Sequence, residues 1–265
     1  MKTSKKNRQA PATIVTDRAI GALLGLAVGD ALGATLEFST RDAHPPVTDM
    51  IGGGPFMLLP GEWTDDTSMA LCLADSLIHC GGYDETDMME RFCRWWMDGE
   101  NSVNGRCFDI GATTREALNR YKWDDLEDRH HRRNEASNGS LMRLAPVPIF
   151  CAAAGVTSAP MAAEQSRATH RNDIAAEACA WLSNMIHAAI IGCSKKDVLT
   201  PKMAANSELK PVLAGAWRKK SRSEIRSTGY AVDTLEAALW CVGHSSTFFG
   251  ALLLAVNLAG DSDTV

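Results

Sequence analysis

The chain has 265 residues, of which 45% are hydrophobic and 22% are charged. This composition supplies one sizeable core and excludes wholesale disorder. The net charge of −5 argues against duplex nucleic acid as a partner, because proteins that bind phosphate backbones usually carry a basic surface. The longest apolar run, 247–259, is shorter than the roughly 20 residues that span a bilayer, so we expect no membrane contact.

Two further features predict a soluble, cytoplasmic protein. The charged start of the chain lacks the apolar segment of a secretory signal. The eight cysteines are scattered, with no CxxC pair and no spacing typical of zinc ligands. Most of them stand in apolar segments, as is usual for buried thiols in a reducing compartment.

The first predicted element is a helix that starts at Thr16 or Asp17, after a flexible basic tail over 1–15. Its apolar residues recur every three or four positions. Four glycines of this helix fall on one side, at positions 21, 25, 29 and 33. Because glycine lowers helix propensity, we expect another backbone to pack closely against that side.

The rest of the chain predicts further helices joined by loops. Apolar residues recur at helical spacing over 68–79, 86–97, 111–121, 161–169, 173–190, 231–241 and 246–258. Three intervening segments are interpreted as surface connections: 123–135, 152–163 and 194–207. Alternation typical of strands is scarce, and no fixed-period repeat is present. We therefore expect one compact all-α domain over 16–265.

Two acidic turns flank long apolar helices. The first is Thr64-Asp65-Asp66, and the second is Asp261-Ser262-Asp263-Thr264. Neighbouring carboxylates repel one another unless a cation or strong donors compensate. Their oxygens suit hard cations such as Mg²⁺ and Mn²⁺. A single such turn is also an ordinary helix cap, so capping and metal binding both remain open from the residues alone.

Two smaller features are also candidate functional sites. Asp30 and Glu37 are seven residues apart and would share one side of a helix that continued through both. The turn Asn138-Gly139-Ser140 precedes an apolar run. Its successive backbone N–H groups can bind an anion such as phosphate, or the turn can simply begin a helix.

Several motifs together resemble the ADP-ribosylglycohydrolase family, the relatives of the dinitrogenase reductase-activating glycohydrolase. In chain order they are GALLGLAVGDALGATLEF, GEWTDDTSMAL, FDIGATT, SNGSLMRLAP, SRATH and NLAGDSDTV, and the resemblance covers 20–265. It implies an all-helical fold with a cleft that holds two divalent cations, Mg²⁺ or Mn²⁺. The metal ligands that it implies are Thr64, Asp65, Asp66, Asp261, Asp263 and Thr264.

The same resemblance assigns roles to other residues. Glu37 matches a glutamate at the metal site, and Asp109 matches a cleft residue near the scissile ribose, so the expected catalytic acid/base is Glu37 or Asp109. The residues implied to contact substrate are Asn138, Gly139 and Ser140 at the diphosphate, His170, and Tyr230 near the adenosine.

The function that the resemblance implies is removal of ADP-ribose from modified protein side chains, with ADP-ribosyl-arginine as the expected substrate. The alternative is a non-catalytic ADP-ribose-binding or immunity-type protein that blocks a partner ADP-ribosyltransferase. Family members continue beyond the second acidic turn into another helix. We therefore expect either a truncated chain or weaker binding of one metal ion.

Overall fold

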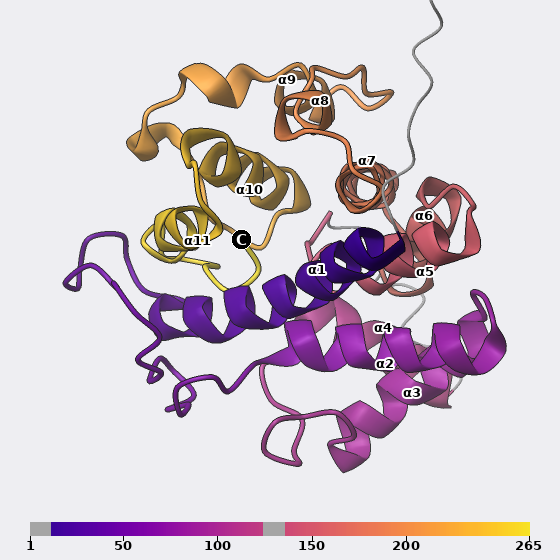
Figure 1. Ribbon diagram of the computed structural model, residues 1–265. Coiled ribbons are helices and arrows are strands. Elements are labelled where there is room, and N and C mark those ends of the chain that lie inside the picture. Colours follow the sequence, from indigo (N-terminus) through magenta and orange to yellow (C-terminus); the bar gives the residue numbers. More distant parts are fainter. Residues whose placement is uncertain (1–11, 124–135) are drawn as a thin grey trace, which may run out of the picture.

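The computed structural model describes residues 12–123 and 136–265, and within them every named element is a helix (Figure 1). The α-helices are α1 (Ala12–Gly33), α2 (Asp65–Cys80), α3 (Glu85–Asp98), α4 (Ala112–Trp123), α5 (Pro146–Ala154), α6 (Ala159–Thr169), α7 (Asp173–Ile190), α8 (Lys195–Val198), α9 (Leu209–Leu213), α10 (Ala231–His244) and α11 (Phe248–Val256). Short 3₁₀ turns are η1 (Ala34–Leu36), η3 (Ala216–Lys219) and η4 (Arg222–Glu224). The predicted all-α class is confirmed.

The helix α5 is the main element that the sequence did not predict. Its first turn contains Pro146 and Pro148. Proline often interrupts a helix, so these two residues suggest a loop. Proline is tolerated in a first turn, because the backbone N–H groups there have no intrahelical acceptor. Part of the predicted connection 152–163 is therefore helical. A second predicted connection, 123–135, lies outside the described residues beyond Trp123.

The first helix begins earlier than the sequence predicted. α1 starts at Ala12, so Thr16 and Asp17 lie inside the helix instead of capping it. Pro11 stands immediately before this start in the sequence. The remaining residues of the predicted tail, 1–11, lie outside the described residues.

The first helix also corrects the expectation about apolar segments. Residues 13–36 form a 24-residue segment of mean hydropathy 1.7, which is long and apolar enough to cross a membrane by length and composition. Asp17, Arg18 and Asp30 interrupt the run, so the sequence analysis passed over it. In the structure α1 packs against α2, α7 and α11, and 28% of its most apolar window is buried.

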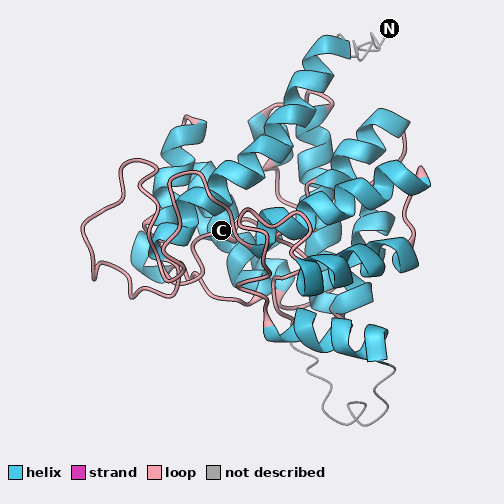
Figure 2. Ribbon diagram, turned by 90° about the horizontal axis from the view of Figure 1, so that it is seen from below, coloured by secondary structure: helices cyan, strands magenta, loops and turns pink. Residues whose placement is uncertain are grey.

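One large apolar core joins most of the helices. It includes Phe92 and Trp95 from α3, Val147 from α5, Cys179 from α7 and Leu235 from α10. In Figure 1, α1 runs across the molecule between the α2–α4 group and the α10–α11 pair. Figure 2 shows loops gathered around the C-terminal end of the chain, between the helices.

The predicted close approach to the glycines of α1 is found at Gly33 alone. A Cβ on Gly33 would lie 2.4 Å from the Cα of Asp263. Gly25 and Gly29 face side chains of α11, and Gly21 has no such atom within 4 Å. Gly33 thus lets the second acidic turn lie directly against the end of α1.

Candidate active site

A cavity of about 900 Å³ lies in the described part of the chain. Its lining includes all but two of the predicted site residues: Glu37, Asp65, Asp66, Asp109, Asn138, Gly139, His170, Tyr230, Asp261, Asp263 and Thr264. The two exceptions, Thr64 and Ser140, are fully buried behind its wall. Segments more than 200 residues apart in sequence therefore meet around one space.

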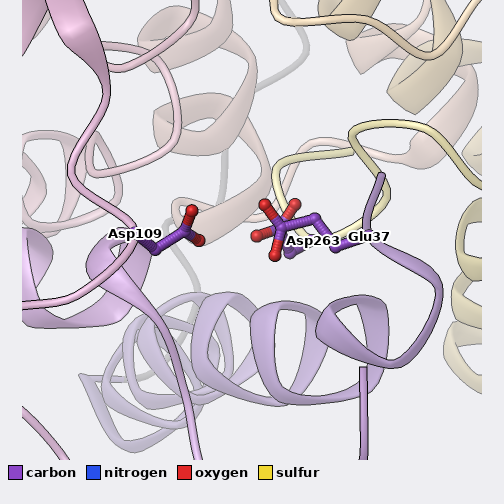
Figure 3. A group of neighbouring side chains, drawn as sticks. All are labelled: Glu37, Asp109 and Asp263. Atoms are coloured by element: carbon purple, nitrogen blue, oxygen red, sulfur yellow. The ribbon is translucent and has the colours of Figure 1, made fainter. Parts of the chain in front are cut away.

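Three carboxylates gather at the base of this cavity. Glu37, Asp109 and Asp263 each offer an oxygen, and these oxygens all lie within 4.8 Å of one another. In Figure 3 the carboxylate of Asp109 faces those of Glu37 and Asp263 from the opposite side. Asp109 has a left-handed backbone with φ of 62°, which is rare for a residue with a side chain. The cluster can hold a metal ion.

The first acidic turn forms the start of α2. Thr64 is the N-cap residue, but its side chain makes no capping hydrogen bond. Instead its hydroxyl donates to Asp30 Oδ1 at 2.9 Å and lies 3.5 Å from Asp263 Oδ2. Asp65 and Asp66 follow in the first helical turn, and both are buried. Simple capping by Thr64 therefore does not explain this turn.

Asp30 holds the start of α2 from behind the cavity. Its carboxylate accepts the backbone N–H and the hydroxyl of Thr64, each at 2.9 Å. It accepts the same two groups of Thr67 at 2.9 and 2.6 Å. Because α1 ends at Gly33, Asp30 does not share a helix side with Glu37 and does not line the cavity. Asp30 is a positioning residue for the first acidic turn.

The second acidic turn is held at several points. Phe38 N donates to Gly260 O at 2.6 Å, which pairs the segment after Glu37 with the start of this turn. Ser262 Oγ donates to Gly33 O at 2.8 Å. These bonds fix the second acidic turn relative to Glu37.

Arg41 binds three backbone carbonyls from two further segments behind the same turn. Its guanidinium donates to Leu258 O at 3.0 Å, and to Arg222 O and Ile225 O at 2.7 Å each. Leu258 lies three residues before Asp261. A planar guanidinium can hold several carbonyl groups in one geometry, which suits it to this task.

Burial and mutual repulsion make the carboxylates of the cavity hard to ionise. Burial, followed by repulsion from Asp109, raises the pKa of Glu37 to about 9. Burial raises the pKa of Asp109 to about 7. Burial and mutual repulsion raise the pKa values of Asp65, Asp66 and Asp263 well above the ordinary range. None of the ion pairs found among the described residues involves these groups.

This donor set fits a hard divalent cation. Glu37 Oε2 is buried and has no hydrogen-bond partner among the described residues. Such an oxygen is costly unless something positive compensates it. Carboxylate and hydroxyl oxygens are the ligands that hard cations prefer.

The loop Asn138–Ser140 contributes Asn138 and Gly139 to the cavity wall. Asn138 Nδ2 donates to Asp261 Oδ2 and to Thr234 Oγ1, each at 2.9 Å, which fixes the start of the loop. Within the described residues, the backbone N–H groups of Gly139 and Ser140 have no acceptor. The hydroxyl of Ser140 points away from the cavity, into the core. Ser140 therefore offers no side-chain donor to the cavity, and the loop residues that line the cavity are Asn138 and Gly139.

Comparison with known proteins decides the family. A model of the family described as ADP-ribosylglycohydrolase matches residues 11–265. The chain belongs to the ADP-ribosylglycohydrolase family. The predicted resemblance is thereby confirmed.

Individual relatives of this glycohydrolase support the same family assignment. The ADP-ribosylarginine hydrolase Tri1 of Pseudomonas putida (strain GB-1) is 49% identical over 254 residues, which cover 94% of this chain and 67% of the relative. The ADP-ribosyl-[dinitrogen reductase] glycohydrolase of Rhodospirillum rubrum is 33% identical over 94% of this chain and 82% of its own length. A solved "ADP-ribosylglycohydrolase-related protein complex" superposes with a TM-score of 0.80 at 38% identity, covering 95% of this chain and 84% of that one.

The glycohydrolase cavity also contains residues that the sequence analysis missed. Phe38 and Phe56 line it, with ring centroids 6.4 Å apart. Thr113 and Arg115 line it from the first turn of α4. The motif FDIGATT, which contains Asp109 and Thr113, was a usable signal for α4. Nothing in the local sequence distinguishes Phe56 from an ordinary loop residue.

Proposed function

We propose that this glycohydrolase hydrolyses the N-glycosidic bond between ADP-ribose and an arginine side chain. The supporting observation is the pairing, in one cavity of about 900 Å³, of a carboxylate cluster with the Asn138–Ser140 loop, in which the N–H groups of Gly139 and Ser140 have no acceptor among the described residues. The carboxylate cluster, with bound cations, suits the ribose end of the ligand, and the backbone N–H groups suit its diphosphate. The choice of arginine is supported by the names of the relatives that are 49% and 46% identical.

We further propose two divalent cations, Mg²⁺ or Mn²⁺, at the acidic end of the cavity. The proposed ligands are Thr64, Asp65, Asp66, Asp261, Asp263 and Thr264. Glu37 and Asp109 face the same space. When bound, the cations supply positive charge that offsets these carboxylates and attracts oxygen atoms of the ligand.

The residues of the chain account for binding and proton transfer. The Gly139 and Ser140 N–H groups bind the diphosphate, and Tyr230 lines the cavity where we place the adenosine. A water molecule attacks the anomeric carbon while the bond to the arginine nitrogen breaks. The Glu37–Asp109 pair accepts a proton from that water and returns one to the leaving nitrogen. The products are ADP-ribose and unmodified arginine.

The proposed partners follow from this chemistry. The substrate is a protein that carries ADP-ribose on arginine, so an ADP-ribosyltransferase must act before this enzyme. We place the reaction in the cytoplasm, in keeping with eight free cysteines, five of which are buried.

The direct test measures ADP-ribose released from a peptide that carries ADP-ribosyl-arginine, with a matched ADP-ribosyl-serine peptide beside it. We expect Mg²⁺- or Mn²⁺-dependent release from the arginine peptide. Asp109→Asn should slow release by about 10²- to 10⁴-fold, which is the usual contribution of a general acid or base. Asp49→Asn, at an exposed carboxylate outside the cavity, is the matched control and should keep the wild-type rate.

Two results would contradict the proposal. Release from the serine peptide alone would overturn the choice of arginine. No release from either peptide, by a sample that binds divalent cations in calorimetry, would overturn the enzymatic function and favour a binding protein.

A further inference from the structure

A buried cation lies behind the Asn138–Ser140 loop. Arg143 is fully buried, and its guanidinium lies 4.6 Å from the ring of Phe92. Its Nε donates to Gln165 Oε1 at 3.0 Å. Its Nη2 donates to Gln165 O at 3.0 Å and to Thr169 Oγ1 at 2.8 Å. No carboxylate pairs with it among the described residues, so its partners are neutral oxygens.

The bond from Arg143 determines what the hydroxyl of Thr169 can do. A guanidinium is only a donor, so Thr169 Oγ1 accepts and keeps its own proton free to donate. Among the described residues, the other hydrogen-bond partner found for this hydroxyl is His170 Nδ1, at 2.7 Å. Because no other acceptor for the hydroxyl proton is found among the described residues, we assign that proton to His170 Nδ1, which is then the unprotonated nitrogen of the ring. In a neutral imidazole the remaining proton is then on Nε2.

The Nε2 side of the ring lies at the cavity. His170 lines the cavity, and its Nε2 would lie 3.0 Å from a Cβ on Gly139. Gly139 is thus the residue that lets the loop approach this ring edge. An Nε2–H group stands beside Gly139, which also lines the cavity, and adds a donor to this part of the wall.

Gln165 ties the same buried cation to the loop. Its Nε2 donates to Ser140 O at 2.9 Å, while its Oε1 accepts from Arg143. The carbonyl of Ser140 is thereby bonded on the core side.

We propose that Arg143, acting through Thr169, fixes His170 as a neutral Nε2–H donor that binds an acceptor oxygen of the ligand, a phosphate or a ribose hydroxyl. Arg143 and Thr169 are positioning residues in this arrangement, and His170 is the residue that touches the ligand. The identity of the ligand rests on the proposed function, whereas the protonation of the ring does not.

The electrostatics support a neutral ring. Burial, together with the positive charge of Arg143, lowers the pKa of His170 to about 3. An imidazolium so close to a buried guanidinium would be repelled by it. The His170 ring therefore stays neutral across the physiological pH range, with Nε2–H as its donor.

The test is spectroscopic and does not depend on activity. Long-range ¹H–¹⁵N correlation spectra of the histidine-labelled full chain report which ring nitrogen carries the proton, and His170→Gln identifies the signals. We expect a protonated Nε2 and an unprotonated Nδ1 at neutral pH. Thr169→Val removes the hydroxyl, so Nδ1 should become protonated in part of the molecules. Thr169→Ser keeps a hydroxyl and should keep the wild-type pattern.

Ligand binding supplies the second measurement. Thr169→Val should weaken ADP-ribose binding in calorimetry by about 3- to 10-fold, as expected for one misdirected hydrogen bond, and KM should change more than kcat. A wild-type ring that is protonated on Nδ1 or on both nitrogens overturns the inference, even if Thr169→Val fails to fold. An unchanged ring pattern in folded Thr169→Val also overturns it. The predicted ring pattern without any hydrolysis would overturn the proposed function and leave this inference standing.

Discussion

Gly33 and Asp263 pack backbone against backbone, because a Cβ on Gly33 would lie 2.4 Å from Asp263 Cα and 2.5 Å from its nitrogen. Gly33 itself has an ordinary helical conformation. Glycine is therefore required here because there is no room for a Cβ, and not because of backbone strain. The contact joins the end of the first long helix to a turn 230 residues later in the chain. The position of the second acidic turn depends on it.

We predict that Gly33→Ala displaces this turn. The added methyl group should cost about 1–3 kcal/mol of unfolding free energy, as overpacking usually does, and should lower divalent-cation affinity. Urea unfolding and calorimetric titration measure the two effects. Gly21→Ala, in the same helix with no such atom within 4 Å, is the control and should raise stability by about 0.5–1 kcal/mol. Equal effects of the two substitutions would argue against this role for Gly33.

The hydrogen bonds to Asp30 give a second prediction. Asp30→Asn replaces one acceptor oxygen by an NH₂ group that faces donors from Thr64 and Thr67. Leaving buried donors unpaired should cost about 1–3 kcal/mol of unfolding free energy and should weaken cation binding through Asp65 and Asp66. Asp17→Asn, exposed on the same helix, should change stability by less than about 0.5 kcal/mol. Wild-type cation affinity in Asp30→Asn would show that Asp30 does not position this turn.

Arg41 gives a third prediction. Arg41→Met removes all three hydrogen bonds to the carbonyls of Leu258, Arg222 and Ile225. We expect a loss of about 1–3 kcal/mol of unfolding free energy, together with weaker cation binding, because the segment before Asp261 loses its support. Arg94→Met, which breaks a partly exposed ion pair with Glu100, should cost less than about 1 kcal/mol. A loss of stability with unchanged cation affinity would assign Arg41 to the fold alone.

A fourth prediction concerns pH and the metal-free protein. With folded-state pKa values of about 9 for Glu37 and about 7 for Asp109, the folded chain holds protons that the unfolded chain has released. The unfolded state therefore binds fewer protons in this range, and stability must fall as pH rises. The Tm of protein treated with a chelator should decrease from about pH 5 to about pH 9, because both groups ionise across that window.

Two comparisons isolate this effect. Glu37→Gln should flatten the upper part of the pH profile, whereas Glu85→Gln, at an exposed position of α3, should leave the profile unchanged. Added Mg²⁺ or Mn²⁺ should raise Tm most at high pH, where the carboxylates are free to bind. A metal-free Tm that rises with pH over the same window would contradict the assigned direction.

Local signals explain why much of the fold was predictable. The helix predicted over 173–190 is found with those bounds, because Asn172 caps it through hydrogen bonds to the N–H groups of Ile174 and Ala175. The acidic turns were also visible, since adjacent carboxylates are unusual beside apolar helices. α5 was missed because proline can both end a helix and begin one.

Contacts between distant segments explain what could not be predicted. The bond from Arg41 to Leu258 spans 217 residues, and no local pattern around Arg41 indicates it. Arg143 did leave a signal, because a cation inside the apolar run 141–151 must find buried acceptors. The identity of these acceptors depends on how α6 packs behind the loop, and so does their effect on His170. The local sequence indicates neither.

The most direct test of this account titrates the protein with Mg²⁺ or Mn²⁺ in a calorimeter, comparing Asp66→Asn from the first acidic turn with Asp263→Asn from the second. If the two turns jointly bind the cations, each substitution should lower the affinity by at least about tenfold, and both should abolish ADP-ribose release. Wild-type cation affinity in either variant would show that the two turns do not form one metal site.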